Sequence, residues 1–282
     1  MQKEPYSERE VAEGIWQVAG FHGGGIGVNA VVLTSNDHTV IVDTLTVPRE
    51  ARRFAKRFQR RGTEPLALVN THWHTDHTAG NSLYNCPIWG QKSGARFLRI
   101  YWPKWMGGPR DKRAQGLRMK LPDRTFARRA SIDLDGEELQ LVHLPGHTTD
   151  SIGVWLPDRR ILVAGDAVME LPFLYFGGNS QDAIRSLRQV RRMRPRIILQ
   201  GHGPPCSSER LETDVRYLEK IRLAARQAQA GGVARKKFVE TPLDEFLPPS
   251  RIRALSEPWR QPHYLHCLNL YKVWAEALKT RR

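Results

Sequence analysis

Four short apolar runs in this chain each lead into a histidine or an aspartate, and this arrangement constrains the fold more than any other feature. The runs are rich in Val, Ile and Leu and end at turn residues, which is typical of buried strands. The side chains that follow them are His72, His147, Asp166 and His202. Because strand ends meet at one edge of a sheet, we expect the four loops to deliver these side chains to one cleft. A glycine immediately before the last three of them lets the backbone turn sharply.

The loop after the first run holds the densest cluster of chemical groups. Within Thr71–His77 the chain carries His72, His74, Asp76 and His77. Histidines at positions i and i+2 beyond a strand end can turn both rings to one side. A tight turn after them can bring Asp76 and His77 to a second point close by. This spacing predicts two adjacent metal ions rather than histidines buried in an ordinary core.

Alternating strand and helix patterns place the chain in the α/β class. The expected strands cover residues 30–33, 40–42, 66–69, 139–144, 161–164 and 197–199. Apolar residues recur at helical spacing over residues 49–61, 181–193, 207–229 and 262–279, which predicts helices there. A serine pair, Ser207 and Ser208, is expected at the N-cap of the third helix, with Glu209 in the first turn.

A diglycine divides the sequence. Gly231 and Gly232 are followed by basic residues and a Pro-rich stretch, which marks a domain boundary. We therefore expect a catalytic domain over residues 1–230 and a helical C-terminal appendage over residues 231–282. The last helix carries an apolar stripe that indicates packing or a homodimer contact, and its members are Tyr264, Leu268, Tyr271, Trp274 and Leu278.

The net charge of +15 indicates either an anionic partner or only a general bias toward arginine. Residues 91–129 concentrate basic side chains among aromatic ones such as Phe97, Tyr101 and Trp105. This insertion fits a lid whose rings form an apolar wall of the cleft. Binding to a nucleic acid is an alternative that we do not favour, and contact with lipid is another.

Other features of the sequence limit the protein class. The three cysteines, Cys86, Cys206 and Cys267, are far apart and form no metal-binding pair, so we expect small apolar fillers. No apolar stretch reaches the length of a membrane span, and the first residues do not resemble a signal peptide, so a cytoplasmic location is predicted. The remaining histidines are expected to have no metal role, and they are His22, His38, His143, His263 and His266.

The motif His-x-His-x-Asp-His with three later ligands resembles the signature of the metallo-β-lactamase fold superfamily. The resemblance covers about residues 12–228 and implies an αβ/βα four-layer sandwich. It implies that one metal ion is held by His72, His74 and His147, that a second is held by Asp76, His77 and His202, and that Asp166 bridges both. It also implies that Asp43 braces the ligand loops.

Imidazole and carboxylate ligands without thiolate favour zinc, and manganese or iron is tolerated by the same ligand set. The expected cofactor is therefore two Zn²⁺ per chain, with a metal-bridging hydroxide as the nucleophile and Asp76 as the catalytic residue that orients it and moves its proton. The leading function is a hydrolase of a small-molecule carboxylic ester, thioester or lactone. Residues after Asp166, such as Glu170 and Tyr175, are expected at the cleft wall.

Three alternatives stay open. A phosphodiesterase or nuclease would use the basic residues of the insertion 91–129 to hold phosphates. β-Lactamase activity is disfavoured, because lactamases of this superfamily lack the bridging carboxylate that Asp166 supplies. Iron-dependent persulfide oxidation would use the same histidines. A glyoxalase II-type specificity is in doubt, because the third motif reads Gly-His-Thr-Thr-Asp-Ser from Gly146.

Overall fold

The computed structural model of the chain describes residues 6–23, 26–59, 65–107, 115–174, 177–255 and 262–279. Residues 108–114 of the basic insertion and Tyr175 lie outside these ranges. Among the described residues, no helix is long and apolar enough to cross a membrane.

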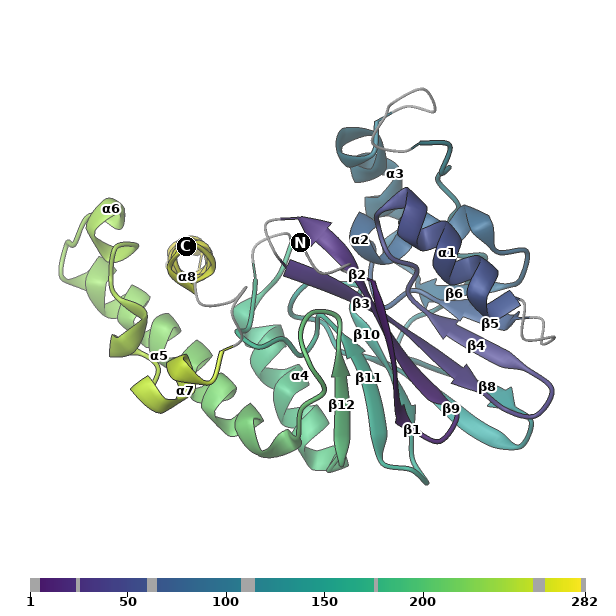
Figure 1. Cartoon of the computed structure of the whole chain (residues 1–282). Coiled ribbons are helices and arrows are strands. Elements are labelled where there is room, and N and C mark those ends of the chain that lie inside the picture. Colours follow the sequence, from purple (N-terminus) through teal and green to yellow (C-terminus); the bar gives the residue numbers. More distant parts are fainter. Residues whose placement is uncertain are drawn as a thin grey trace, which may run out of the picture.

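Two β-sheets lie face to face at the centre of the molecule (Figure 1). The first sheet has the strand order β1-β2-β3-β4-β5-β6-β7, antiparallel as far as β4 and parallel from β4 onward. Its strands are β1 Ser7–Ala12, β2 Ile15–Gly23, β3 Ile26–Thr34, β4 Thr39–Val42, β5 Pro65–Val69, β6 Ile88–Gln91 and β7 Arg124–Phe126.

The second sheet has the order β12-β11-β10-β9-β8, and only its β11–β12 pair is parallel. Its strands are β8 Arg129–Leu134, β9 Glu137–His143, β10 Ile152–Leu156, β11 Ile161–Gly165 and β12 Ile197–Gln200. All six strands expected from the sequence are present, and the one expected over 139–144 is β9, which begins at Glu137.

The helices are α1 Pro48–Gln59, α2 Thr75–Thr78, α3 Gly94–Trp105, α4 Ser180–Met193, α5 Leu211–Ala230, α6 Arg235–Phe238, α7 Pro249–Arg253 and α8 Pro262–Lys279. Short 3-10 turns cover Ala79–Leu83, Ser208–Arg210 and Leu243–Glu245. The helix expected over 207–229 begins as the second of these turns, where the Ser207 side chain accepts a hydrogen bond from the Glu209 N–H group, and continues as α5.

Successive side chains of a strand point to opposite faces of its sheet, and this alternation produces the layers of the fold. Val40 and Val42 of β4 pack between the sheets, whereas Ile41 packs with α1. In β11, Val163 faces the first sheet and Leu162 packs with α4 and α5. The central strands are covered on both faces, so β4, β10 and β11 are buried along their whole length, whereas β1, β7 and β8 expose many of their residues. The result is the predicted αβ/βα four-layer sandwich, with α1 on one side and α4 and α5 on the other (Figure 1).

The C-terminal region packs on α4 and α5. Phe238, Phe246, Leu270 and Val273 belong to the same hydrophobic cluster as Leu218 of α5. A boundary at residue 230 stays a prediction, and the region beyond it shares its apolar core with the body of the protein.

Most of the apolar stripe of α8 lies outside the face that packs against the rest of the chain. Trp274 is buried as expected, but Tyr264, Tyr271 and Leu278 are 70%, 40% and 50% exposed. The inward face carries instead the buried residues His266, Asn269, Leu270, Val273 and Ala277. Two of these are polar, so apolar spacing alone did not identify the face that packs against the rest of the chain. Association of two copies through the exposed stripe stays a prediction.

Candidate metal centre

Seven buried side chains from four loops meet at one edge of the two sheets. The first four follow β5, at and just before α2, and they are His72, His74, Asp76 and His77. His147 lies between β9 and β10, Asp166 follows β11, and His202 follows β12. The structure thus brings together every residue that the sequence proposed as a metal ligand.

The seven side chains form two groups. One consists of His72, His74, His147 and Asp166, the other of Asp76, His77 and His202, and in each group one ligand atom per residue lies within 4.8 Å of the others. The Asp166 carboxylate faces both groups. Its Oδ2 atom is 3.3 Å from His147 Nε2 and 3.4 Å from His202 Nε2, and its Oδ1 atom is 3.4 Å from His77 Nε2.

The polar atoms at the centre fit a pair of cations. His72 Nε2, His77 Nε2 and Asp166 Oδ1 are buried, and they have no hydrogen-bond partner among the described residues. A buried polar atom left in this way costs about 1–3 kcal/mol unless another group binds it. Imidazole nitrogens and carboxylate oxygens are suitable ligands for zinc and for related divalent ions. The two groups can therefore each hold a metal ion.

Hydrogen bonds on the outer side fix how three of the histidines are turned. The Nδ1–H group of His147 donates to the Phe173 carbonyl at 2.9 Å, and that of His202 donates to the Gly27 carbonyl at 2.7 Å. His77 Nδ1 donates to Asp43 Oδ2 at 2.8 Å. Because these partners accept a hydrogen bond, Nδ1 carries a hydrogen, and the Nε2 atom of each ring faces the centre.

Asp43 lies where the resemblance implied a brace. It follows β4 with a φ of 64°, and its Oδ1 atom accepts from the Thr71 N–H group at 2.8 Å. Its Oδ2 atom accepts from Thr71 Oγ1 at 2.7 Å as well as from His77. One carboxylate thus connects the end of β4 to both ends of the loop that carries the first four ligands.

Burial and neighbouring charges determine the protonation of the site. Burial lowers the pKa of His72 well below its ordinary value, and the adjacent His77 and His74 act in the same direction. Burial opposes ionisation of Asp166, but the histidines around it, His202 first, hold its pKa well below the usual range. Burial opposes protonation of His77 and His202, but Asp76 and Asp166 raise the pKa of His77 well above its ordinary value, and Asp166 raises that of His202 to about 10. A cation bound to the Nε2 atoms of these two rings would take the place of the protons they carry.

Two of the glycines that precede ligands are required for different reasons. Gly165 adopts a φ of 49°, a left-handed conformation that favours glycine. Gly201 is required for space, because a Cβ atom there would lie 2.0 Å from Asp166 Oδ1.

Aromatic rings border the first group of ligands. On α3, Phe97, Tyr101 and Trp105 stack on Trp73 with ring centroids 5.8, 4.6 and 5.2 Å from it. Trp105 lies 5.5 Å from the His74 ring, and Phe173 lies 5.7 Å from the His147 ring on the other side. The basic side chains of α3, including Arg96, Arg99 and Lys104, are exposed. This arrangement favours the apolar wall over stacking of nucleic-acid bases.

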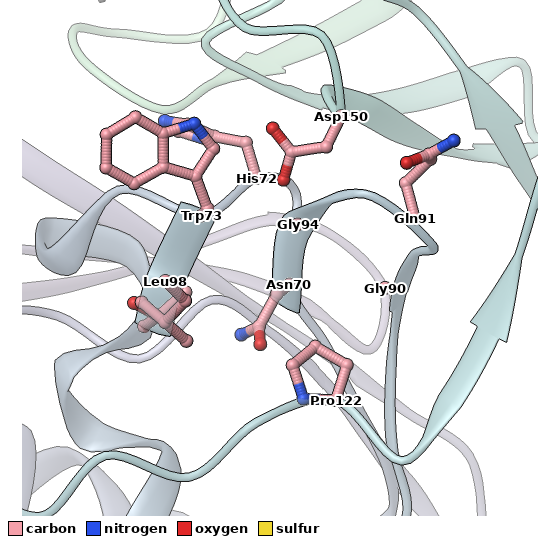
Figure 2. A pocket seen from close by; sticks show the side chains of 10 residues that line it. Asn70, His72, Trp73, Gly90, Gln91, Gly94, Leu98, Pro122 and Asp150 are labelled. Atoms are coloured by element: carbon pink, nitrogen blue, oxygen red, sulfur yellow. The ribbon is translucent and has the colours of Figure 1, made fainter. Parts of the chain in front are cut away.

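Asp150 is a buried residue near the site that the sequence did not single out. Its carboxyl lies among His72, Trp73 and Gly94 in the pocket of Figure 2. It accepts hydrogen bonds from Thr148 Oγ1, at 2.7 Å, and from the Trp73 backbone N–H. Burial raises its pKa to about 7. The only signal in the sequence was the departure of the third motif from the glyoxalase II pattern at this position.

The other predicted residues lie as follows. Glu170 is buried, and its side chain lies against Gly203, beside His202. His38 pairs with Asp135, His143 contacts the Thr149 carbonyl, and His266 contacts Tyr217. The side chains of His22 and His263 lie outside the described part of the chain. The three cysteines are free and partly buried.

Comparisons with known proteins give a consistent result. The family model for the metallo-beta-lactamase superfamily matches residues 23–202. A beta-lactamase-like protein 2 homolog from Caenorhabditis elegans is 31% identical over 137 residues, which cover 49% of this chain but only 42% of that protein. The acyl-coenzyme A thioesterase MBLAC2 from Homo sapiens is 24% identical over 83% of this chain and 90% of its own length.

A solved structure shows the same fold over almost the whole chain. The metallo-beta-lactamase family protein from Thermus thermophilus superimposes with a TM-score of 0.65 and covers 95% of each chain at 18% identity.

Proposed function

Since this chain belongs to the metallo-β-lactamase superfamily, we propose that it is a dinuclear zinc-dependent hydrolase that cleaves thioesters, within the wider class of carboxylic esters and lactones. The position of Asp166 carries the proposal. Its two oxygens face both groups of ligands, so one carboxylate can bridge a pair of ions. The similarity to an acyl-coenzyme A thioesterase over most of both chains supports the choice of thioesters.

When bound, two zinc ions would lower the pKa of a water between them to about 7 and polarise the carbonyl oxygen of the substrate. The side chains of His72, His74 and His147 would hold one ion and those of Asp76, His77 and His202 the other. Asp76 Oδ2 lies 3.2 Å from His202 Nε2 and 3.4 Å from His77 Nε2. From this position the Asp76 carboxylate would orient the nucleophile and accept its proton.

The surroundings of the site fit the two halves of a thioester. Trp105 and Phe173 would keep water away from an apolar acyl group beside His74 and His147. The exposed cations of α3 would attract the phosphates of a coenzyme A group, and this attraction would weaken as salt increases. We expect a small-molecule substrate and a cytoplasmic location.

A panel of substrates tests the proposal. Zinc-loaded protein would be assayed on an acyl-coenzyme A, S-lactoylglutathione, an acyl lactone, a nitrocefin-type β-lactam and bis-p-nitrophenyl phosphate, with chelator-treated and Asp166→Ala protein as controls. We expect the acyl-coenzyme A to turn over fastest and both controls to be inactive. Preferential cleavage of the phosphodiester would establish the nuclease alternative instead. Inactivity with zinc, together with persulfide oxidation by the iron-loaded protein, would also refute the proposal.

A further inference from the structure

The helix α8, at the C-terminal end of the chain, reaches the metal centre through the loop that follows Asp166. His147 donates its Nδ1 hydrogen to the carbonyl of Phe173 in this loop. The two residues on either side of Phe173 are held by one side chain, that of Asn269 on α8. The Leu174 N–H group donates to Asn269 Oδ1 at 3.0 Å, and Asn269 Nδ2 donates to the Pro172 carbonyl at 2.6 Å.

Asn269 is itself held in one orientation. It is completely buried, and its Nδ2 atom also donates to the Tyr217 hydroxyl of α5 at 3.0 Å. That hydroxyl lies 2.9 Å from His266 Nδ1, and His266 Nε2 lies 3.1 Å from the Thr241 carbonyl. The donors run in one consistent direction. Asn269 donates to Tyr217, the Tyr217 hydroxyl can donate to His266 Nδ1, and His266 Nε2–H can donate to Thr241.

A second residue of α8 holds the other side of the His147 loop. Glu276 lies seven positions after Asn269, two helical turns further along the same face. Its carboxylate accepts hydrogen bonds from the N–H group and the hydroxyl of Ser180 at the start of α4. The preceding residue, Asn179, donates its N–H group to the carbonyl of Gly146, which immediately precedes His147.

We propose that Asn269 is a positioning residue for His147, so that the C-terminal helix is part of the metal centre although it contributes no ligand. Fixing Pro172 and Leu174 fixes the Phe173 carbonyl between them. That carbonyl in turn sets the ring orientation and the tautomer of His147. Groups that orient a ligand in this way typically change metal affinity by about 10–100-fold when they are removed. The inference rests on the proposed metal site but not on the identity of the substrate.

The test is the zinc affinity of the full-length protein, measured by competition with a chromophoric chelator. Asn269→Leu keeps the approximate volume of the side chain and removes its hydrogen bonds. His147→Ala and His202→Ala identify which of the two binding steps belongs to each group of ligands. Val273→Ala, one turn further along the buried face of α8, loosens the packing of the helix without altering the contacts of Asn269.

We expect Asn269→Leu to weaken by about 10–100-fold the same step that His147→Ala weakens, and to leave the other step unchanged. Val273→Ala should leave both steps at the wild-type affinity. Wild-type zinc affinity in Asn269→Leu, or an equal weakening in Val273→Ala, would overturn the inference. A wild-type chain that binds zinc but cleaves no thioester would refute the proposed function and leave this inference intact.

Tyr217→Phe provides the same test in a variant that conserves the core. It removes the hydroxyl that accepts from Asn269 Nδ2 and contacts His266 Nδ1, and it leaves the ring in the core. We expect a smaller weakening of the His147 step, and this variant decides the question if Asn269→Leu does not fold. An unchanged His147 step in Tyr217→Phe would then contradict the role of Asn269.

Discussion

Gly201 packs against Asp166 so closely that a Cβ atom on Gly201 would lie 2.0 Å from Asp166 Oδ1 and 2.8 Å from His77 Cε1. The Gly201 N–H group also donates to the Gly165 carbonyl at 2.9 Å, which joins the two loops that carry Asp166 and His202. The candidate bridging carboxylate is therefore held between the ends of β11 and β12 by a residue with no side chain.

Gly201→Ala should displace the Asp166 carboxylate and abolish binding of at least one metal ion. The chain should still fold, because the new methyl group lies at the edge of the sheets. Gly231→Ala is the matched control, since a Cβ atom there meets only ordinary contacts at 3.5 Å or more. Zinc content after dialysis distinguishes them. A Gly201→Ala protein with the wild-type zinc content would show that the loop accommodates the methyl group and that Asp166 still binds metal.

Asp43→Asn should lower by about 10–100-fold the affinity for the metal ion that Asp76, His77 and His202 hold. The amide cannot accept at both positions, so it leaves either Thr71 or His77 without its acceptor. Asp135→Asn is a close control, because Asp135 also has a positive φ and accepts from a histidine Nδ1 atom, but at the surface. Competition with a chromophoric chelator measures the zinc affinity of both variants. Equal affinities in the two would contradict a bracing role for Asp43.

Asp150 should make stability depend on pH. Its folded-state pKa of about 7 exceeds the ordinary value of 3.8, so the folded chain binds this proton more tightly than the unfolded chain does. The stabilisation is complete below about pH 4 and is lost as the pH rises to about 7. Between pH 5 and pH 8 the free energy of unfolding of the wild type should fall by about 2–3 kcal/mol more than that of Asp150→Asn.

Urea unfolding with chelator present measures this difference, because other titrating groups contribute equally to both proteins. Parallel pH profiles for the wild type and Asp150→Asn would mean that the Asp150 carboxyl is ionised throughout.

Asp214→Ala should destabilise the protein by about 3–5 kcal/mol, since it leaves two largely buried arginines without their shared carboxylate. Asp214 is 1% exposed and lies 3.5 Å from Arg210 Nε and 3.4 Å from Arg251 Nη2. Glu212→Ala, on the same helix, breaks only exposed pairs and should cost less than about 1 kcal/mol. Urea unfolding measures the loss of stability in both variants. Similar losses in Asp214→Ala and Glu212→Ala would argue against a buried charge cluster.

The sequence predicted the layers and the meeting of the ligands because both depend on local patterns. Val40 and Val42 alternate with Ile41, and His147, Asp166 and His202 each follow a strand of the second sheet. Such patterns need no knowledge of distant contacts.

The remaining features depend on long-range partners. Helix α3 was not predicted, because Pro103 and many charged residues obscure its apolar face. The inward face of α8 contains His266 and Asn269, whose burial is favourable only because Tyr217 and the loop around Phe173 supply their hydrogen bonds. The burial of Asp150 likewise depends on the Trp73 backbone, 77 residues earlier in the chain.

The metal content of the purified full-length protein, measured by elemental mass spectrometry, is the direct test of a dinuclear zinc centre. We expect two zinc ions per chain, with the loss of at least one in Asp166→Ala. A wild-type chain that holds a single ion, or that holds iron in place of zinc, would contradict a dinuclear zinc centre bridged by Asp166.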